Sequence, residues 1–99
     1  MKLWLDDLRP APKGWLWVKD VGRAMQVILA FEAVNQEWED ASFDNDLGQH
    51  PAGDGYKLLD WMEEHDHWPT NRPTCHSGNP VRRKYIEDTI NRHYDQGDG

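Results

Sequence analysis

The sequence predicts an α/β fold built on a mainly parallel sheet of four strands. Two observations support this prediction. Short apolar runs and helical apolar patterns follow one another in the order strand, strand, helix, strand, helix, strand, helix. In addition, the third and fourth strands are each reached through a helix, and crossovers of this kind join parallel strands in a sheet that carries helices on its faces.

Four short apolar runs supply the strands, at residues 2–6, 15–18, 40–44 and 72–77. Binding sites in open sheets lie beyond the carboxyl ends of the strands. Because those ends meet at one edge, we expect the polar side chains that end the first, third and fourth runs to converge. These side chains are Asp6, Asp7, Asp44, His76 and Ser77.

Three amphipathic patterns supply the helices. The first covers residues 21–34 behind Asp20 as the N-cap, and the second has its apolar stripe in residues 56–62. The third begins with Asn79 as the N-cap and Pro80 at the first helical position. We expect its buried stripe to consist of Val81, Tyr85, Ile86 and Ile90.

The composition limits the classes of function. The 99 residues suit one domain, which we expect to span 1–94 with a flexible tail at 95–99. A net charge of −7 argues against non-specific DNA binding. Cys75, the single cysteine, is typical of a reducing compartment. Since no apolar run is long enough to span a bilayer, we expect a cytoplasmic protein with no membrane partner.

The stretch 42–56 contains three aspartates, the residue type that begins a calcium loop. When the loop is started at Asp44, its first and third positions fit, but Gln49 takes the place of the required glycine. Gly55 takes the place of the bidentate glutamate at the twelfth position. The calcium-loop interpretation therefore fails.

Six segments occur in the order of a known family. They are LWLDDLRP (3–10), GWLWVK (14–19), DLG (46–48), GY (55–56), WMEEHDHWP (61–69) and HSGNP (76–80). Together they resemble the cyclic-phosphate processing receiver domain, an atypical branch of the receiver domains. The resemblance implies a three-layer, receiver-like (flavodoxin-like) sandwich with strand order 2-1-3-4. This sequence departs from ordinary receivers after the third helix, and we expect a truncated fold without the fifth strand and its phosphate-pairing lysine.

The resemblance also implies a site. Asp6, Asp7 and Asp44 would form an acidic pocket for Mg²⁺, with Ser77 at a phosphate. Asp44 is a catalytic candidate as well, because a carboxylate near a metal can attack phosphorus, although we favour it as a ligand. His76 is the second catalytic candidate, since it could protonate a leaving oxygen.

Arg9 and Arg82 are candidates to hold the phosphate, and the alternative for each is a solvated surface cation. Asn45 departs from the family, which has histidine between two aspartates at this point. His50, in the following loop, could substitute for that histidine.

The leading hypothesis is a Mg²⁺-dependent phosphoesterase-like domain that binds or processes a cyclic phosphate on a nucleotide or an RNA end. The main alternative is a degenerate receiver that binds a ligand or a protein, including a homodimer formed through the exposed sheet edge. A third interpretation is a switch phosphorylated on Asp44.

Overall fold

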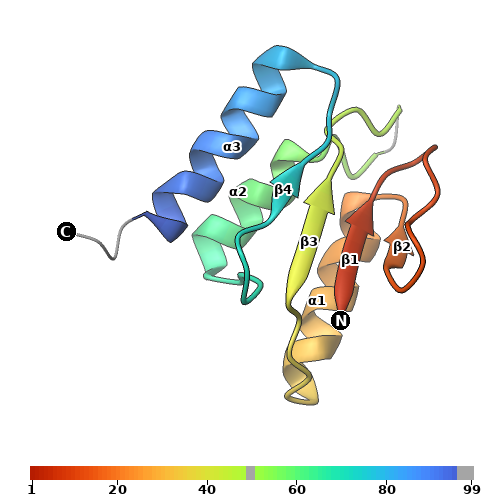
Figure 1. Ribbon diagram of the computed structural model, residues 1–99, viewed down its shortest axis with the longest axis vertical. Coiled ribbons are helices and arrows are strands. Elements are labelled where there is room, and N and C mark those ends of the chain that lie inside the picture. The colour runs from red at the N-terminus through yellow and green to blue at the C-terminus, as the bar shows by residue number, and fades with distance from the viewer. Residues whose placement is uncertain (49–50, 96–99) are drawn as a thin grey trace.

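The computed structural model describes residues 1–48 and 51–95 and contains four strands and three helices (Figure 1). The strands are all parallel and lie in the order β2-β1-β3-β4, as predicted. Each strand lies within its predicted run. Residues 96–99 of the predicted tail are outside the described residues. The strands are β1 Lys2–Leu5, β2 Leu16–Val18, β3 Asp40–Phe43 and β4 Thr74–Cys75.

Two of the three helices begin at the side-chain caps that the sequence predicts. Asp20 accepts a hydrogen bond from the N–H of Arg23, and Asn79 accepts one from the N–H of Arg82. No helix among the described residues is long and apolar enough to cross a membrane. The helices are α1 Val21–Ala33, α2 Tyr56–His65 and α3 Pro80–Tyr94.

The buried stripe of α3 differs from the prediction. Ile86 and Ile90 are buried as expected, whereas Val81 is 75% exposed and Tyr85 is exposed as well. The reason is the position of the helix, whose first turn lies beyond the tip of β4 (Figure 1). Thr89 is buried in their place, and its hydroxyl donates to the carbonyl of Tyr85.

All three helices lie on one face of the sheet. The crossovers from β2 to β3 and from β3 to β4 advance in the same direction, so right-handed connections bring α1 and α2 to the same face. Neighbouring helices pack against each other, and Figure 1 shows the strands in front of α1 and α2. The described chain therefore has two layers where the three-layer sandwich was expected. The connection between β1 and β2 contains no helix.

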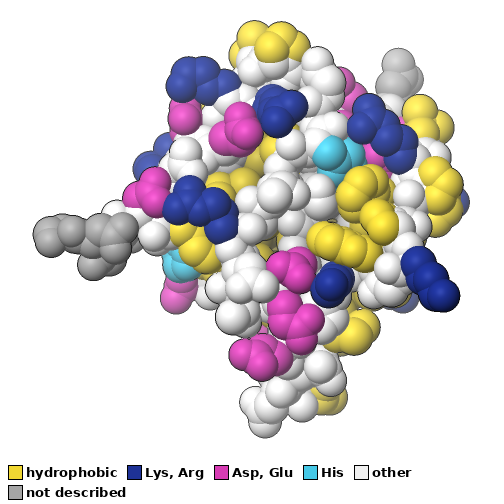
Figure 2. Space-filling view, in the orientation of Figure 1, with side chains coloured by type: hydrophobic (Ala, Val, Ile, Leu, Met, Phe, Trp, Pro, Cys, Tyr) yellow, Lys and Arg dark blue, Asp and Glu magenta, His cyan; other side chains and the backbone are white. Residues whose placement is uncertain are grey.

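Alternate strand residues point toward the helices and form the core of the molecule. On the other face, Trp4, Ser42 and Thr74 lie beside one another in register across β1, β3 and β4. Figure 2 shows this uncovered face, with hydrophobic side chains gathered over β1 and a histidine beside them. The core-facing strand residues are Leu3, Leu5, Val18, Ala41, Phe43 and Cys75.

Candidate metal and phosphate site

Asp6, Asp44 and His76 are the next even-numbered residues after the row of Trp4, Ser42 and Thr74. The N–H of each donates to a carbonyl of a neighbouring strand, at 2.8 to 3.1 Å. These hydrogen bonds extend the parallel ladders past the strand ends. The sheet itself therefore brings two carboxylates and an imidazole together at its carboxyl edge.

Asp6 is held from several sides. It is 1% exposed, and its Oδ1 accepts hydrogen bonds from the backbone N–H groups of Leu8 and Arg9, both at 2.8 Å. Its Oδ2 lies 3.0 Å from Nε2 of His76. Burial by itself would raise the pKa of Asp6, but the hydrogen bonds from Arg9, Leu8 and His76 outweigh it and lower that pKa. Asp6 is therefore a carboxylate at neutral pH.

Asp7 and Asp44 complete an acidic cluster with Asp6, in which one oxygen of each carboxylate lies within 4.8 Å of the others. Oδ1 of Asp7 is buried and has no hydrogen-bond partner among the described residues. Burial, followed by the negative charge of Asp6, raises the pKa of Asp44. Three carboxylates at this separation repel one another when ionised.

This cluster is chemically suited to a hard divalent cation. Mg²⁺ prefers oxygen ligands and is usually bound by one or two carboxylates together with water and phosphate oxygens. The partnerless Oδ1 of Asp7 is the kind of buried acceptor that a cation satisfies. The side chains predicted as ligands therefore fit such an ion.

His76 has both ring nitrogens engaged. Nε2 contacts Asp6, and Nδ1 lies 2.7 Å from the hydroxyl oxygen of Ser42. The indole of Trp4 stacks on the imidazole with 4.0 Å between ring centroids. The histidine predicted as a catalytic group therefore does lie beside the acids, in a fixed orientation.

The predicted phosphate-binding residues differ in how close they lie to His76. The Arg9 guanidinium donates to the carbonyl of His76 at 3.1 Å and is largely exposed. Ser77, the residue after His76, is buried, and its hydroxyl oxygen accepts a hydrogen bond from the N–H of Asn79. Arg82 instead places its guanidinium 4.1 Å from the ring centroid of Tyr56.

Comparison with known families places the chain in a family. The family model for the cyclic-phosphate processing receiver domain matches residues 1–92. The chain belongs to this family. The receiver-like α/β fold is thereby confirmed, and the family's name links the domain to cyclic-phosphate processing. No curated protein and no solved structure matches the chain.

Asn45, the departure from the family pattern, has a structural role in this receiver domain. It is 1% exposed, and its Oδ1 accepts the N–H of Tyr56 at the start of α2. Its Nδ2 donates to Asp46 at 3.0 Å. The side chain thus joins the end of β3 to α2. His50, considered as a substitute for the missing histidine, is outside the described residues.

Three residues near the site were missed by sequence reasoning: Trp4, Ser42 and Thr74. Each contributes to the packing or hydrogen bonding around His76. The signal that could have found them is strand alternation, since they stand two residues before Asp6, Asp44 and His76, and residues two apart share a face.

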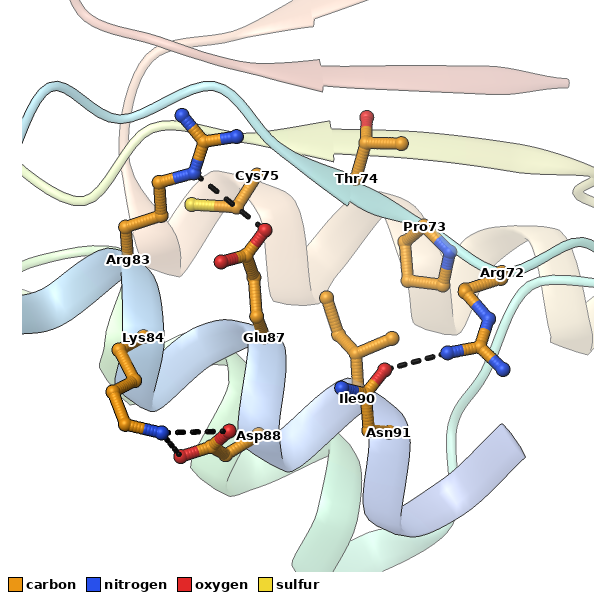
Figure 3. Close-up of a pocket in the computed structure, with 10 residues that line it drawn as sticks. All are labelled: Arg72, Pro73, Thr74, Cys75, Arg83, Lys84, Glu87, Asp88, Ile90 and Asn91. Atoms are coloured by element: carbon orange, nitrogen blue, oxygen red, sulfur yellow. Dashed lines mark hydrogen bonds and ion pairs between the residues drawn. The ribbon is translucent and has the colours of Figure 1, made fainter. Parts of the chain in front are cut away.

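A cavity of about 490 Å³ lies elsewhere on the receiver domain, between β4 and α3 (Figure 3). None of the predicted site residues lines it. Its three cations all have polar neighbours with which they are bonded or paired. These contacts are Arg83 with Glu87, Lys84 with Asp88, and Arg72 with Asn91 and Asp95.

Proposed function

We propose that this receiver domain binds Mg²⁺ through Asp6, Asp7 and Asp44 and, beside the ion, binds or opens a cyclic phosphate on a nucleotide or an RNA end. One observation supports this above the others: the buried Oδ1 of Asp7 has no partner among the described residues although two more carboxylates lie beside it. Leaving a charged acceptor buried without a partner costs free energy. A cation would remove that cost.

The three acids have different capacities to bind an ion. Oδ1 of Asp6 already accepts two backbone N–H groups, so Asp6 would contribute through Oδ2, beside the His76 contact. Among the residues that the structure describes, Asp7 and Asp44 carry no comparable set of hydrogen bonds, and they would supply most of the negative charge. When bound, the ion would neutralise phosphate charge and lower the pKa of a bound water.

The phosphate would lie against Arg9, whose guanidinium donates to the His76 carbonyl, and against Ser77, the next residue along the chain. The Arg9 guanidinium is exposed at the rim of the site and can form a charge-assisted pair with a phosphate oxygen. Ser77 would donate its hydroxyl hydrogen. Arg82 would contribute only after leaving the ring of Tyr56.

Opening a cyclic phosphate adds a water oxygen to phosphorus, breaks one ring P–O bond and leaves an oxygen that takes up a proton. In our proposal the doubly protonated form of His76 shifts its Nε2–H from Asp6, 3.0 Å away, to that oxygen, releases the proton and is left neutral with its remaining proton on Nδ1. Asp44, whose pKa is raised by burial and by Asp6, would accept the proton of the attacking water. The net result is hydrolysis with no other reactant.

The test measures Mg²⁺ binding by calorimetry and turnover of 2′,3′-cyclic and 3′,5′-cyclic nucleotides by phosphorus NMR. We expect Mg²⁺ to bind the wild-type protein and Asp7→Asn to remove that binding. Asp66→Asn, a change at an exposed aspartate in a left-handed cap position that asparagine favours, is the matched control and keeps it. If the wild-type protein neither binds Mg²⁺ nor turns over any of these nucleotides, the proposal is wrong.

A second function, binding without chemistry, is favoured by Asn45. Both ends of its side chain hold the local structure, and asparagine does not exchange protons at neutral pH. In this alternative the same pocket binds Mg²⁺ and the cyclic phosphate but releases the phosphate unchanged. Saturable binding of a cyclic nucleotide with no product after prolonged incubation would distinguish it from hydrolysis.

For a protein partner we propose a second copy of the chain at the open edge of β4. Along α3, the cations Arg83 and Lys84 precede the acids Glu87 and Asp88 on the wall of the cavity between β4 and α3 (Figure 3). A two-fold axis would place the cations of one α3 against the acids of the other. Pro73 has no N–H to donate at this edge, so the helices would supply most contacts.

Light scattering tests this pairing. We expect a dimer that dissociates as salt is added, since salt screens exposed charge pairs. A monomer at every protein concentration, in low salt as well as high, would rule the pairing out.

A further inference from the structure

A chain of hydrogen bonds runs behind the acidic cluster, from β4 across β3 to the end of β1. Thr74 donates to the hydroxyl oxygen of Ser42 at 3.0 Å, and that oxygen lies 2.7 Å from Nδ1 of His76. Nε2 of the same ring lies 3.0 Å from Oδ2 of Asp6. Ser42 is 4% exposed, so its hydroxyl depends on protein partners.

The direction of each hydrogen bond follows from the chemistry of the groups. The other oxygen of Asp6 accepts two backbone N–H groups, so this side chain is an acceptor and Nε2 of His76 must donate to it. A neutral imidazole has a single N–H, which makes Nδ1 an acceptor. Ser42 therefore donates to Nδ1, and its oxygen accepts the hydroxyl hydrogen of Thr74.

The ring of His76 is restrained on its face as well as at both nitrogens. The indole of Trp4 lies parallel to it, at an interplanar angle of 8°. Trp4 is itself held, because its Nε1 donates to the carbonyl of Arg9 at 2.9 Å. Ser42 is the neighbour of both Trp4 and Thr74 in the strand register.

We propose that Ser42 and Thr74 are positioning residues that act through His76. By holding Nδ1, they keep the Nε2–H of the ring directed at Asp6. Neither hydroxyl contacts the acidic cluster itself in the hydrogen bonds of the described residues.

The effect of this ring orientation on metal binding rests on the proposed function. Groups that hydrogen-bond to a metal-binding carboxylate typically change metal affinity about 10- to 100-fold. With Nε2–H fixed on Oδ2, Asp6 presents its remaining electron pairs in one direction. Ser42 acts one hydrogen bond further from the ligand, through His76, so we expect Ser42→Ala to weaken Mg²⁺ binding about tenfold, the low end of this range.

The direct test needs no metal and no nucleotide. In ¹⁵N-labelled protein at about pH 8, where imidazole is ordinarily neutral, long-range ¹H–¹⁵N spectra report which ring nitrogen carries the proton. For His76 we expect a protonated Nε2 and an unprotonated, hydrogen-bonded Nδ1. In Ser42→Ala the Nδ1 resonance should move toward that of a free imidazole, and the contacts with Trp4 protons should weaken.

Further variants separate positioning from general destabilisation. Ser42→Thr retains a hydroxyl and should keep the wild-type Nδ1 resonance, whereas Thr74→Val should move it less than Ser42→Ala does. Thr89→Val, which removes a buried hydroxyl in α3, is the control and should leave His76 unchanged.

Three outcomes would overturn the inference: a wild-type ring protonated on Nδ1, an unmoved Nδ1 in Ser42→Ala, or an equal shift in Thr89→Val. Because these spectra are recorded without Mg²⁺, a failure of Mg²⁺ binding would refute the proposed function alone.

Discussion

Asp6 and Asp7 are neighbours in the sequence with opposite energetic roles. Both oxygens of Asp6 are hydrogen-bonded, and its pKa is lowered because these bonds outweigh burial. Oδ1 of Asp7 is buried with no partner among the described residues. One aspartate therefore stabilises the apo fold, and the other reduces its stability.

Two conservative substitutions should therefore have opposite effects without Mg²⁺. Asp7→Asn reduces repulsion in the acidic cluster and should raise the free energy of unfolding by about 1 kcal/mol, or the melting temperature by about 4–8 °C. Asp6→Asn can place an amide N–H against the Nε2–H of His76 and should cost about 1–3 kcal/mol. Thermal unfolding of both variants checks this, and changes of the same sign would contradict it.

The raised pKa of Asp44 predicts a pH-dependent response to Mg²⁺. Burial and the charge of Asp6 lift this pKa above its ordinary value of 3.8, so the folded apo protein holds the proton more tightly than the unfolded chain. The stability from Asp44 is thus present below pH 3.8 and is lost as the pH rises through the raised value.

Since Mg²⁺ binds the charged form of Asp44, the stabilisation that Mg²⁺ gives should increase as the pH rises through the same range. Melting temperatures with and without Mg²⁺, from about pH 4 to pH 7, measure this effect. Asp66→Asn should show the wild-type dependence, and a Mg²⁺ response independent of pH would contradict the prediction.

The residues at the carboxyl edge could be predicted because each ends an apolar run in a parallel sheet. Strand alternation also places Ser42 and Thr74 on the face of Asp44 and His76, but the sequence does not show that this face lacks helices, so their hydrogen bonds to one another and to His76 were missed. The role of Asn45 was also hidden, since its partner Tyr56 is 11 residues away across a loop.

At the scale of elements, the approach of α2 to β3 requires a glycine at position 55. A Cβ on Gly55 would lie 2.1 Å from the backbone oxygen of Asp44. The N–H of Gly55 also donates to the carbonyl of Asn45 at 2.8 Å. The start of α2 therefore rests directly on the residues that follow β3.

Gly55→Ala should destabilise the domain by about 1–3 kcal/mol, because backbone must move to admit the methyl group. That movement displaces Asp44, so the Mg²⁺ response should fall as well. Gly78→Ala is the control, since apart from its chain neighbours no described residue has an atom within 4 Å of the added Cβ. Chemical denaturation of both variants compares them, and equal stabilities would contradict the prediction.

Some features of the helices and strands could be predicted from the sequence, and others could not. The strand runs and the caps Asp20 and Asn79 depend on local patterns and were predicted correctly. The single helical layer depends on the direction in which successive strands are added, together with a helix-free first connection. Val81 is exposed because its turn passes the end of the sheet, which helical spacing does not reveal.

Across the whole molecule, Tyr94 ties the last turn of α3 to the segment that leads into β4. Its hydroxyl donates to the carbonyl of Pro69 at 2.6 Å and lies 3.2 Å from that of Asn71. Burial raises the pKa of Tyr94 to about 12, from an ordinary 10.0. The protonated phenol is therefore the form that stabilises the fold.

This shift predicts a loss of stability in alkali. The contribution of Tyr94 is fully present below about pH 10 and is lost as the pH rises toward about 12. Tyr94→Phe should cost about 1 kcal/mol at pH 9 and should show a smaller further loss at pH 11. Urea midpoints at both pH values measure this, and identical alkaline losses in the two proteins would contradict it.

The contact between Asp6 and His76 joins residues 70 positions apart. A site assembled across that span exists only after β1, β3 and β4 have come together, so any opening that separates these strands also dismantles it. A ligand bound there would slow amide hydrogen exchange in all three strands together, by the same factor as it lowers the population of the globally unfolded state. The proposed site is therefore present only in the cooperatively folded domain.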